Sequence, residues 1–375
     1  MKIVLAPDSF KESMTASQAV AAMREGVRMA LPGAECVGVP MADGGEGTVD
    51  AVVDALGGDR VTVEVKDPLG RPARATYGYV ADRHLAVIEM ASASGLELVA
   101  PADRDILRAS TFGVGQLIAS ALDRGAAELL IGLGGSATND GGAGMLTALG
   151  VSFSDSDGSA LPPGGAALAR LQHIDVAGLD PRLAHVRVRI ASDVTAPLLG
   201  TGGASAVFGP QKGATPADVE VLETALTRLV DVTETALGHA RPDRAGAGAA
   251  GGLGFGLMEF LAAECDRGVE VIAQTVGLEQ SLTGADWVFT GEGSVDAQTM
   301  LGKTPFGVAQ VAARTGTRVV IFAGRVAPDA DVLLSNGVEK LVAITAPATP
   351  LDQALREGPG ALARATAEVC RAIAP

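Results

Sequence analysis

The sequence predicts an α/β protein with a Rossmann-like, doubly wound parallel sheet that is interrupted by a second, inserted α/β domain with antiparallel or mixed strands. Apolar strand patterns alternate with helical patterns over about the first 60 residues, and this alternation returns after residue 285. Between them, residues 61–90 alternate with the period of two that is typical of hairpins. A chain of 375 residues also usually forms about two domains.

The opening segment is predicted to form a strand, a polar loop and a helix. Residues 2–6 are mostly apolar, and Thr15 and Gln18 have the spacing of a capping box at the start of a helix. A second strand near residues 36–39, a glycine-rich loop and a helix capped by Thr48 repeat the pattern. This order of elements is typical of a parallel sheet covered by helices.

The middle and the end of the chain differ in their patterns. Residues 61–65 and the following turn predict antiparallel hairpins. Later strands are predicted at residues 287–289, 319–322 and 341–344, with helices beginning at Thr304 and after Gly360. We therefore expect a Rossmann-like domain made of residues 1–61 and 285–375, and an inserted α/β domain made of residues 62–284.

Composition excludes several kinds of partner. The chain has 49 glycines, 47% hydrophobic and only 3% aromatic residues, which suits parallel strands built from small aliphatic side chains. A net charge of −15 opposes binding to nucleic acid or to an anionic membrane surface. The three cysteines are far apart, and no stretch of about 18 apolar residues occurs, so we expect a reduced, cytoplasmic protein.

The first two loops lie at predicted strand ends, where open α/β sheets bind ligands. In the first loop, Lys11 could neutralise a phosphate, and Asp8 and Ser9 could contact a metal or a hydroxyl group. In the second loop, Asp43 is followed by Gly44 and Gly45, whose backbone can approach an anion closely. The alternative interpretation is a pair of polar turns, with Lys11 in solvent and a tight connection into the next helix.

A third glycine-rich segment, residues 134–142, follows the apolar strand at residues 129–133. It predicts a cradle for phosphate or substrate, with Gly134, Gly135, Ser136 and Asn139 as the candidate binding residues. A serine-hydrolase elbow requires a glycine two residues after the serine, and Thr138 stands there instead.

Asp193 follows another predicted strand, residues 186–191, and places one carboxylate at its end. A base at this position could remove a proton from a substrate hydroxyl, which typically contributes about 10²- to 10⁴-fold in rate. An aspartate that caps a loop is the alternative interpretation.

The last candidate segment follows the strand at residues 287–289. Glu292 and Asp296 are four residues apart and could bind one metal ion, and Lys303 could contact phosphate. The residues before Lys303 nearly match a P-loop, but Ala297 replaces its first glycine, so we do not expect P-loop chemistry. Residues 246–251 match a dinucleotide fingerprint but follow no predicted strand, which argues against a nicotinamide site.

Six segments, taken in order along nearly the whole chain, resemble the bacterial glycerate kinase family, of the two-domain, glycerate 2-kinase type. They are Ala6–Ser13, Pro40–Thr48, Gly132–Gly142, Ser192–Val194, Gly251–Gly254 and Thr290–Asp296. The resemblance implies a kinase that transfers a phosphoryl group from ATP, with Mg²⁺, to D-glycerate. The 2-hydroxyl is the expected acceptor, and the expected products are 2-phosphoglycerate and ADP.

Within that family interpretation, we expect Asp193 to accept the hydroxyl proton and Lys11 to stabilise charge on the transferred group. Phosphorylation at the 3-hydroxyl, or of a related small hydroxy acid, is the alternative within the kinase class. Two other classes stay open at this point: a nicotinamide-dependent dehydrogenase and a non-catalytic sensor of a hydroxy acid.

Overall fold

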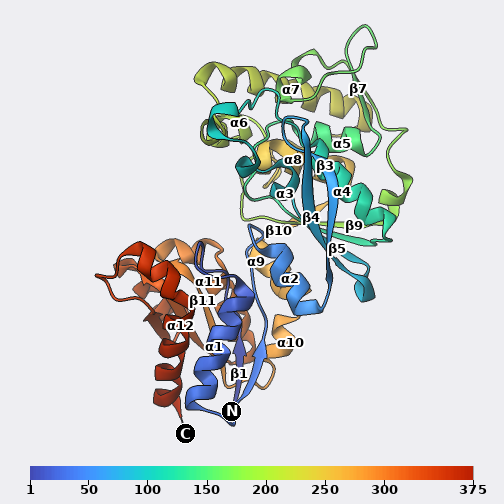
Figure 1. The fold of residues 1–375 in the computed structure, drawn as a ribbon. Coiled ribbons are helices and arrows are strands. Elements are labelled where there is room, and N and C mark those ends of the chain that lie inside the picture. Colours follow the sequence, from blue (N-terminus) through green and yellow to red (C-terminus); the bar gives the residue numbers. More distant parts are fainter. Residues whose placement is uncertain (375) are drawn as a thin grey trace. The chain divides into compact units, whose positions relative to one another are not determined.

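The computed structural model describes residues 1–374, which divide into two compact units (Figure 1). Unit 1 contains Met1–Asp43, Gly47–Gly57 and the residues from Arg267 onward. Unit 2 contains Gly44–Glu46 and Gly58–Asp266. The units are described separately below.

The division into units differs at two places from the expected domain boundaries. The strand β3 (Asp59–Lys66) pairs along its whole length with β4 (Pro72–Val80), so residues 58–61 belong to unit 2. Residues 267–284 belong to unit 1, because α9 (Gly268–Thr275) and α10 (Leu278–Leu282) pack with α11 (Thr304–Thr315). The expected domains stay a prediction. They are a Rossmann-like domain of residues 1–61 and 285–375, and an inserted domain of residues 62–284.

Unit 1 contains a five-stranded sheet in which all neighbouring strands are parallel, in the order β13-β12-β11-β1-β2. The strands are β1 (Lys2–Leu5), β2 (Glu35–Gly38), β11 (Trp287–Val295), β12 (Arg318–Val326) and β13 (Lys340–Ala343). The chain moves to one side from β1 to β2 and then returns to the other side at β11. This reversal beside β1 is the switch point of a doubly wound sheet, which confirms the predicted fold class.

The helices of unit 1 begin largely as predicted. The helix α1 (Ala16–Ala30) has the expected capping box of Thr15 and Gln18. The helix α2 (Thr48–Leu56) starts differently: its N-cap is Gly47 in a left-handed conformation, so the expected cap by Thr48 is wrong. Figure 1 shows α1 beside the C-terminal helix α12 (Leu351–Ile373), and both bury side chains against β1, β11 and β12.

The helix α12 begins nine residues before the position that its sequence predicts, and it contains Pro359. A proline cannot donate to the carbonyl four residues earlier, here that of Leu355. The hydroxyl of Ser13 donates to this carbonyl at 2.7 Å. A side chain from the loop after β1 therefore replaces the hydrogen bond that Pro359 removes, and the helix continues through it.

Unit 2 contains a mixed six-stranded sheet in the order β10-β9-β6-β5-β4-β3. The remaining strands are β5 (Leu85–Glu89), β6 (Glu128–Gly132), β9 (Arg187–Ala191) and β10 (Glu264–Asp266), with a separate hairpin of β7 (Ser152–Ser154) and β8 (His173–Asp175). The β3-β4-β5 segment is antiparallel, as predicted, whereas β5, β6, β9 and β10 run parallel. Unit 2 therefore has a mixed sheet, as expected of the insertion.

Six α-helices belong to unit 2, and short 3₁₀ helices occur in both units. The α-helices are α3 (Ala91–Ser94), α4 (Phe112–Asp123), α5 (Ala143–Ala148), α6 (Ala204–Phe208), α7 (Pro216–Leu237) and α8 (Ala249–Phe260). The 3₁₀ helices are η1 (Ala81–Arg83), η2 (Leu96–Leu98), η3 (Pro101–Asp103), η4 (Gly165–Arg170), η5 (Pro181–His185), η6 (Pro210–Lys212), η7 (Ala297–Leu301) and η8 (Pro328–Asn336). No helix within residues 1–374 has the length and apolar character needed to cross a membrane.

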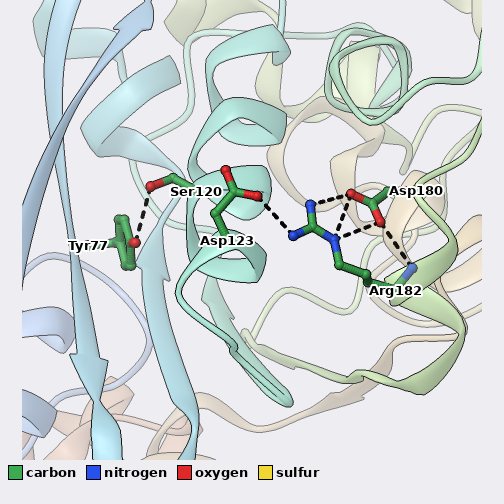
Figure 2. Close-up of polar contacts among 5 residues, drawn as sticks. All are labelled: Tyr77, Ser120, Asp123, Asp180 and Arg182. Atoms are coloured by element: carbon green, nitrogen blue, oxygen red, sulfur yellow. Dashed lines mark hydrogen bonds and ion pairs between the residues drawn. The ribbon is translucent and has the colours of Figure 1, made fainter.

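Polar contacts join α4 to its neighbours at the surface of unit 2 (Figure 2). The Arg182 guanidinium lies 2.6 Å from Asp180 and 2.9 Å from Asp123 on α4. These carboxylates raise the pKa of Arg182, and Arg182 lowers the pKa of Asp180. On the other side of α4, the Ser120 and Tyr77 hydroxyls are 3.2 Å apart. Because 45% of the Arg182 side chain is exposed, its ion pairs are screened by solvent.

Candidate active site

Three carboxylates gather beside the β1-β11 switch point of unit 1. Asp8 follows β1, and its backbone N–H donates to the Gly291 carbonyl at 2.9 Å, which extends the pairing with β11. Its carboxylate accepts hydrogen bonds from the backbone N–H of Ser9 at 2.6 Å and from the Thr304 hydroxyl. Glu292 lies within β11 and accepts from the Thr299 hydroxyl at 3.1 Å.

Burial and nearby negative charge both raise the pKa values of Asp8 and Glu292. Burial and then the negative charge of Asp43 raise the pKa of Asp8 to about 7, although Thr304 and Ser9 act in the opposite direction. Burial raises the pKa of Glu292 to about 7 as well, against the Lys303 ammonium. Asp43 also contributes to raising the pKa of Glu292. The structure therefore brings together Asp8, Asp43 and Glu292 from three loops that the sequence marked separately.

One lysine contacts this acidic set, and another lies in the same loop as Asp8. The Lys303 ammonium lies 3.6 Å from Glu292 and 3.4 Å from the Ser294 carbonyl oxygen. Lys11 is exposed, at the end of the loop after β1, and Ser9 is half-buried in the same loop. The positive charge next to Glu292 thus comes from Lys303, a flexible side chain that can also reach a bound anion.

The predicted metal ligands Glu292 and Asp296 have different surroundings. The Asp296 carboxylate accepts from the backbone N–H of Gln298 at 2.9 Å and caps the helix η7. Glu292 instead faces Asp8 and Asp43. Among the residues that the structure describes, no group of three or more His, Cys, Asp or Glu side chains is arranged to hold a metal ion by itself.

A second set of loops lies at the carboxyl ends of β6 and β9 in unit 2. These strands are parallel neighbours, and Gly132 pairs with Ala191. Gly44 adopts φ +90°, and a Cβ there would collide with the Ala191 carbonyl, while a Cβ on Gly132 would collide with the Gly44 carbonyl. A Cβ on Gly134 would lie 3.1 Å from the Gly45 Cα. Glycine is required at these positions because backbone approaches backbone.

Asp193 lies at the same edge, two residues after β9. The Val194 N–H donates to the Ser192 hydroxyl at 3.3 Å, which turns the chain at this strand end. Asp193 is exposed, so its carboxylate is accessible to a ligand. Asp193, Gly44 and Gly45 therefore lie at one sheet edge together with the loop that follows β6.

This loop, residues 133–142, has an exposed half and a buried half. Gly134 and Gly135 are exposed and Ser136 is half-buried. Asn139 is fully buried, and its amide donates to the Ser205 hydroxyl at 3.0 Å. The first half of the loop can thus contact a ligand, whereas the Asn139 side chain is committed to the interior.

Several polar residues at these edges were not predicted from the sequence. Thr304 and Thr299 bind the carboxylates of unit 1, and Ser205 and Lys212 lie beneath the loop of unit 2. Thr304 follows the predicted phosphate ligand Lys303, and that neighbourhood is the signal that could have identified it. For the other three, the sequence offers only ordinary turn and helix patterns.

Known proteins are similar to this chain along its whole length. A family model described as the glycerate kinase family matches residues 3–374. The glycerate kinase of Bacillus subtilis is 46% identical over 373 residues, covering 100% of this chain and 98% of that protein. The glycerate 2-kinase of Escherichia coli is 44% identical over 374 residues, covering 100% of this chain and 98% of that protein.

A solved structure gives the same result. The crystal structure of a putative glycerate kinase 2 from Salmonella typhimurium superposes with a TM-score of 0.92 at 45% sequence identity, covering 100% of this chain and 98% of that one. The predicted resemblance is thereby confirmed over the whole fold, both units included. The chain is an enzyme of the kinase class, and it belongs to the glycerate kinase family.

Proposed function

We propose that this enzyme transfers the γ-phosphoryl group of ATP to the 2-hydroxyl of D-glycerate and releases 2-phosphoglycerate and ADP. The observation that carries the proposal is the acidic set of Asp8, Asp43 and Glu292 at the switch point of a doubly wound sheet, with Lys303 beside it. Phosphoryl transfer depends on positioning and charge stabilisation, and these groups can supply both.

The acidic set fits Mg²⁺ in its chemistry. Mg²⁺ prefers hard oxygen ligands and is usually held by one or two carboxylates together with substrate phosphates. Glu292, with Asp8 or Asp43, would supply the carboxylates, and burial together with nearby negative charge raises the pKa values of Asp8 and Glu292. Asp296 is the weaker candidate, because its carboxylate already caps η7. When bound, the ion neutralises charge on the nucleotide phosphates.

ATP is the phosphoryl donor that membership of a kinase family implies. Lys303 and Lys11 would contact the phosphates, with Lys11 stabilising charge on the transferred group. Ser9 would orient a phosphate oxygen, and its backbone N–H already holds Asp8 in place. Each of these roles belongs to unit 1.

The acceptor would be handled by the loops of unit 2. Asp193 would take the proton from the glycerate hydroxyl, because it is the exposed carboxylate at the β9 end. The backbone amides near Gly44, Gly45, Gly134, Gly135 and Ser136 would hold the anionic carboxylate of glycerate. The Asn139 side chain is buried, so its contribution would be to fix the loop.

The name of the Escherichia coli relative, glycerate 2-kinase, supports the 2-hydroxyl as the acceptor. The two products can be distinguished by phosphorus NMR, because the phosphoryl group couples to one proton in 2-phosphoglycerate and to two in 3-phosphoglycerate. We expect the 2-phospho product. The 2-phospho product gives a doublet in the proton-coupled spectrum. A triplet in its place would reassign the acceptor to the 3-hydroxyl.

Release of ADP in the presence of enzyme, ATP, Mg²⁺ and D-glycerate tests the proposed reaction directly. We expect ADP with D-glycerate and much less with lactate, which has the carboxylate and the 2-hydroxyl but not the 3-hydroxyl. No ADP with glycerate or with related hydroxy acids would contradict the proposed reaction.

The role of Asp193 can be tested separately. Asp193→Asn keeps the shape of the side chain but removes the base, so we expect kcat to fall by about 10²- to 10⁴-fold while substrate binding is largely retained. Asp231→Asn is the matched control, because Asp231 is an exposed residue of α7. Nearly normal turnover in Asp193→Asn would remove Asp193 from the reaction.

A further inference from the structure

A lysine is buried beneath the ligand loop of unit 2. Lys212 ends the short helix η6 and is 2% exposed. Its ammonium donates to the carbonyl oxygen of Thr138 at 2.7 Å. Burial lowers the pKa of Lys212 to about 7, although the negative charge of Asp140 acts in the opposite direction. No residue of the predicted site explains why a lysine occupies this interior position.

Lys212 is one of several buried partners that hold consecutive residues of the loop. The Asn139 amide donates to Ser205, which lies in α6, the helix just before η6. Asp140 accepts from the Thr111 N–H at 2.8 Å and from the N–H groups of the turn that follows it. Residues 138, 139 and 140 are thus each fixed by a separate polar contact in the interior.

Backbone packing fixes the same part of the loop from another side. The Gly141 N–H donates to the Gly251 carbonyl at 3.0 Å. A Cβ on Gly251 would collide with the Thr138 carbonyl, the same group that accepts from Lys212. The Thr138 carbonyl is therefore held between two neighbours, and of these two Lys212 supplies the hydrogen-bond donor.

Stability alone does not explain the lysine. A buried ammonium must be removed from water, a cost that an apolar side chain in the same place would not carry. Methionine would fill the same space without that desolvation. A buried charge that is kept in spite of this cost, next to a ligand-binding loop, is a candidate for a role in function.

We propose that Lys212 is a positioning residue: it holds the Thr138 carbonyl so that the amides of Gly134, Gly135 and Ser136 stay oriented toward the carboxylate of the acceptor. This inference rests on the proposed function, which assigns those amides to glycerate. The loop and Asp193 follow the neighbouring parallel strands β6 and β9. In the proposed function, the loop and Asp193 both contact the acceptor, and residues of unit 1 bind the nucleotide.

The test compares Lys212→Met with the wild-type enzyme and with Lys340→Met, a control at an exposed lysine on β13. We expect kcat/KM for glycerate to fall by about 10- to 100-fold in Lys212→Met, since small misplacements of binding groups cost factors of this size. We expect KM for ATP to stay within about twofold, and Tm to fall because the buried Thr138 carbonyl loses its hydrogen-bond donor. The control should match the wild type in all three measurements.

Lys212→Gln separates positioning from packing, because it keeps an N–H donor on a side chain one bond shorter. We expect it to recover part of the loss in kcat/KM. A lower Tm with unchanged kinetics of the folded enzyme, in either variant, would show that Lys212 serves only the fold and would overturn the proposal. An equal rise in KM for ATP and for glycerate would overturn it as well.

Hydrogen exchange distinguishes this inference from the proposed function. In Lys212→Met, we expect faster amide exchange in residues 134–140 and unchanged exchange in the strands β6 and β9. Unchanged exchange in the loop would contradict the positioning role even if the wild type phosphorylates glycerate. Faster loop exchange in a protein that releases no ADP with glycerate would instead contradict the proposed substrate and leave the contact between Lys212 and the loop established.

Discussion

The carboxylates of unit 1 and the buried carboxylate of unit 2 differ in how their charges are satisfied. Burial raises the pKa of Asp140 in unit 2, but four hydrogen bonds from Thr111, Gly142 and Gly144 favour its charged form. Asp8 and Glu292 have fewer donors and face other negative charges. Asp140 thus has its own set of donors as a structural anchor, whereas Asp8 and Glu292 lie beside other carboxylates, as the proposed Mg²⁺ site requires.

The largest expected effect separates the two kinds of carboxylate by activity. In Glu292→Gln, we expect kcat/KM for ATP-dependent turnover to fall by at least about 100-fold, because a metal-binding carboxylate is lost while the Thr299 contact can be kept. Glu270→Gln is the control, at an exposed residue of α9. Similar activity in the two variants, measured over a range of Mg²⁺ concentrations, would show that Glu292 is not a ligand.

The second effect is on stability and belongs to unit 2. Asp140→Asn places an N–H₂ group where N–H donors converge, so we expect the free energy of unfolding to fall by about 2 to 4 kcal/mol. Denaturant unfolding would measure the loss of stability. Hydrogen exchange in residues 133–142 would show whether the loss is centred on this loop. A loss below about 0.5 kcal/mol would show that Asp140 is no more an anchor than the carboxylates of unit 1.

The third prediction concerns pH and Mg²⁺ in unit 1. Asp8 has a pKa of 3.8 in its ordinary state and about 7 in the folded protein, so the folded protein binds more protons between these pH values. The contribution of Asp8 to the free energy of unfolding therefore falls as pH rises from about 4 to 7. Mg²⁺ at ten times its Kd should add about 1.4 kcal/mol at pH 8.

At pH 5.5, where Asp8 and Glu292 are largely protonated, the stabilisation by Mg²⁺ should be smaller, and in Glu292→Gln it should be absent at both pH values. Calorimetry with and without Mg²⁺ measures the difference. A gain in Tm of the same size at pH 5.5 and pH 8 would place the bound ion away from Asp8 and Glu292.

The smallest effect is expected for the exposed ion pairs in Figure 2. Removing the guanidinium in Arg182→Ala should change the free energy of unfolding by no more than about 1 kcal/mol, because solvent screens Asp123 and Asp180. Chemical denaturation provides the measurement, and kinetic constants should stay at wild-type values. A change above about 2 kcal/mol would mean that surface charges contribute as much as the buried anchor.

The sequence predicted the sheet, the strand-end loops and the family, because each depends on local patterns of apolar residues and glycine. It also identified Asp8, Asp43 and Glu292, but only as members of separate motifs. Their convergence depends on the parallel pairing of β1 with β11, which joins residues almost 300 positions apart. No local pattern contains that information.

Other features could not be predicted because their partners are distant in the sequence. The turn that ends with Lys212 gives no indication that the side chain points inward to Thr138. The last helix was predicted to begin after Gly360, but it begins earlier and contains Pro359. The Leu355 carbonyl that Pro359 leaves unpaired accepts from Ser13, at the other end of the chain. In both cases a polar atom finds its partner only after the whole unit has folded.

The division of unit 1 along the chain has a consequence for biosynthesis. A ribosome releases the N-terminal residues first, so β1 emerges long before β11, its parallel neighbour at the switch point. Unit 2 is almost continuous, from Gly58 to Asp266, and its core can form while later residues are still being made. Asp8, Asp43 and Glu292 therefore come together only after β11 has been made, and a nascent chain stopped before β11 would hold the core of unit 2 without this acidic set.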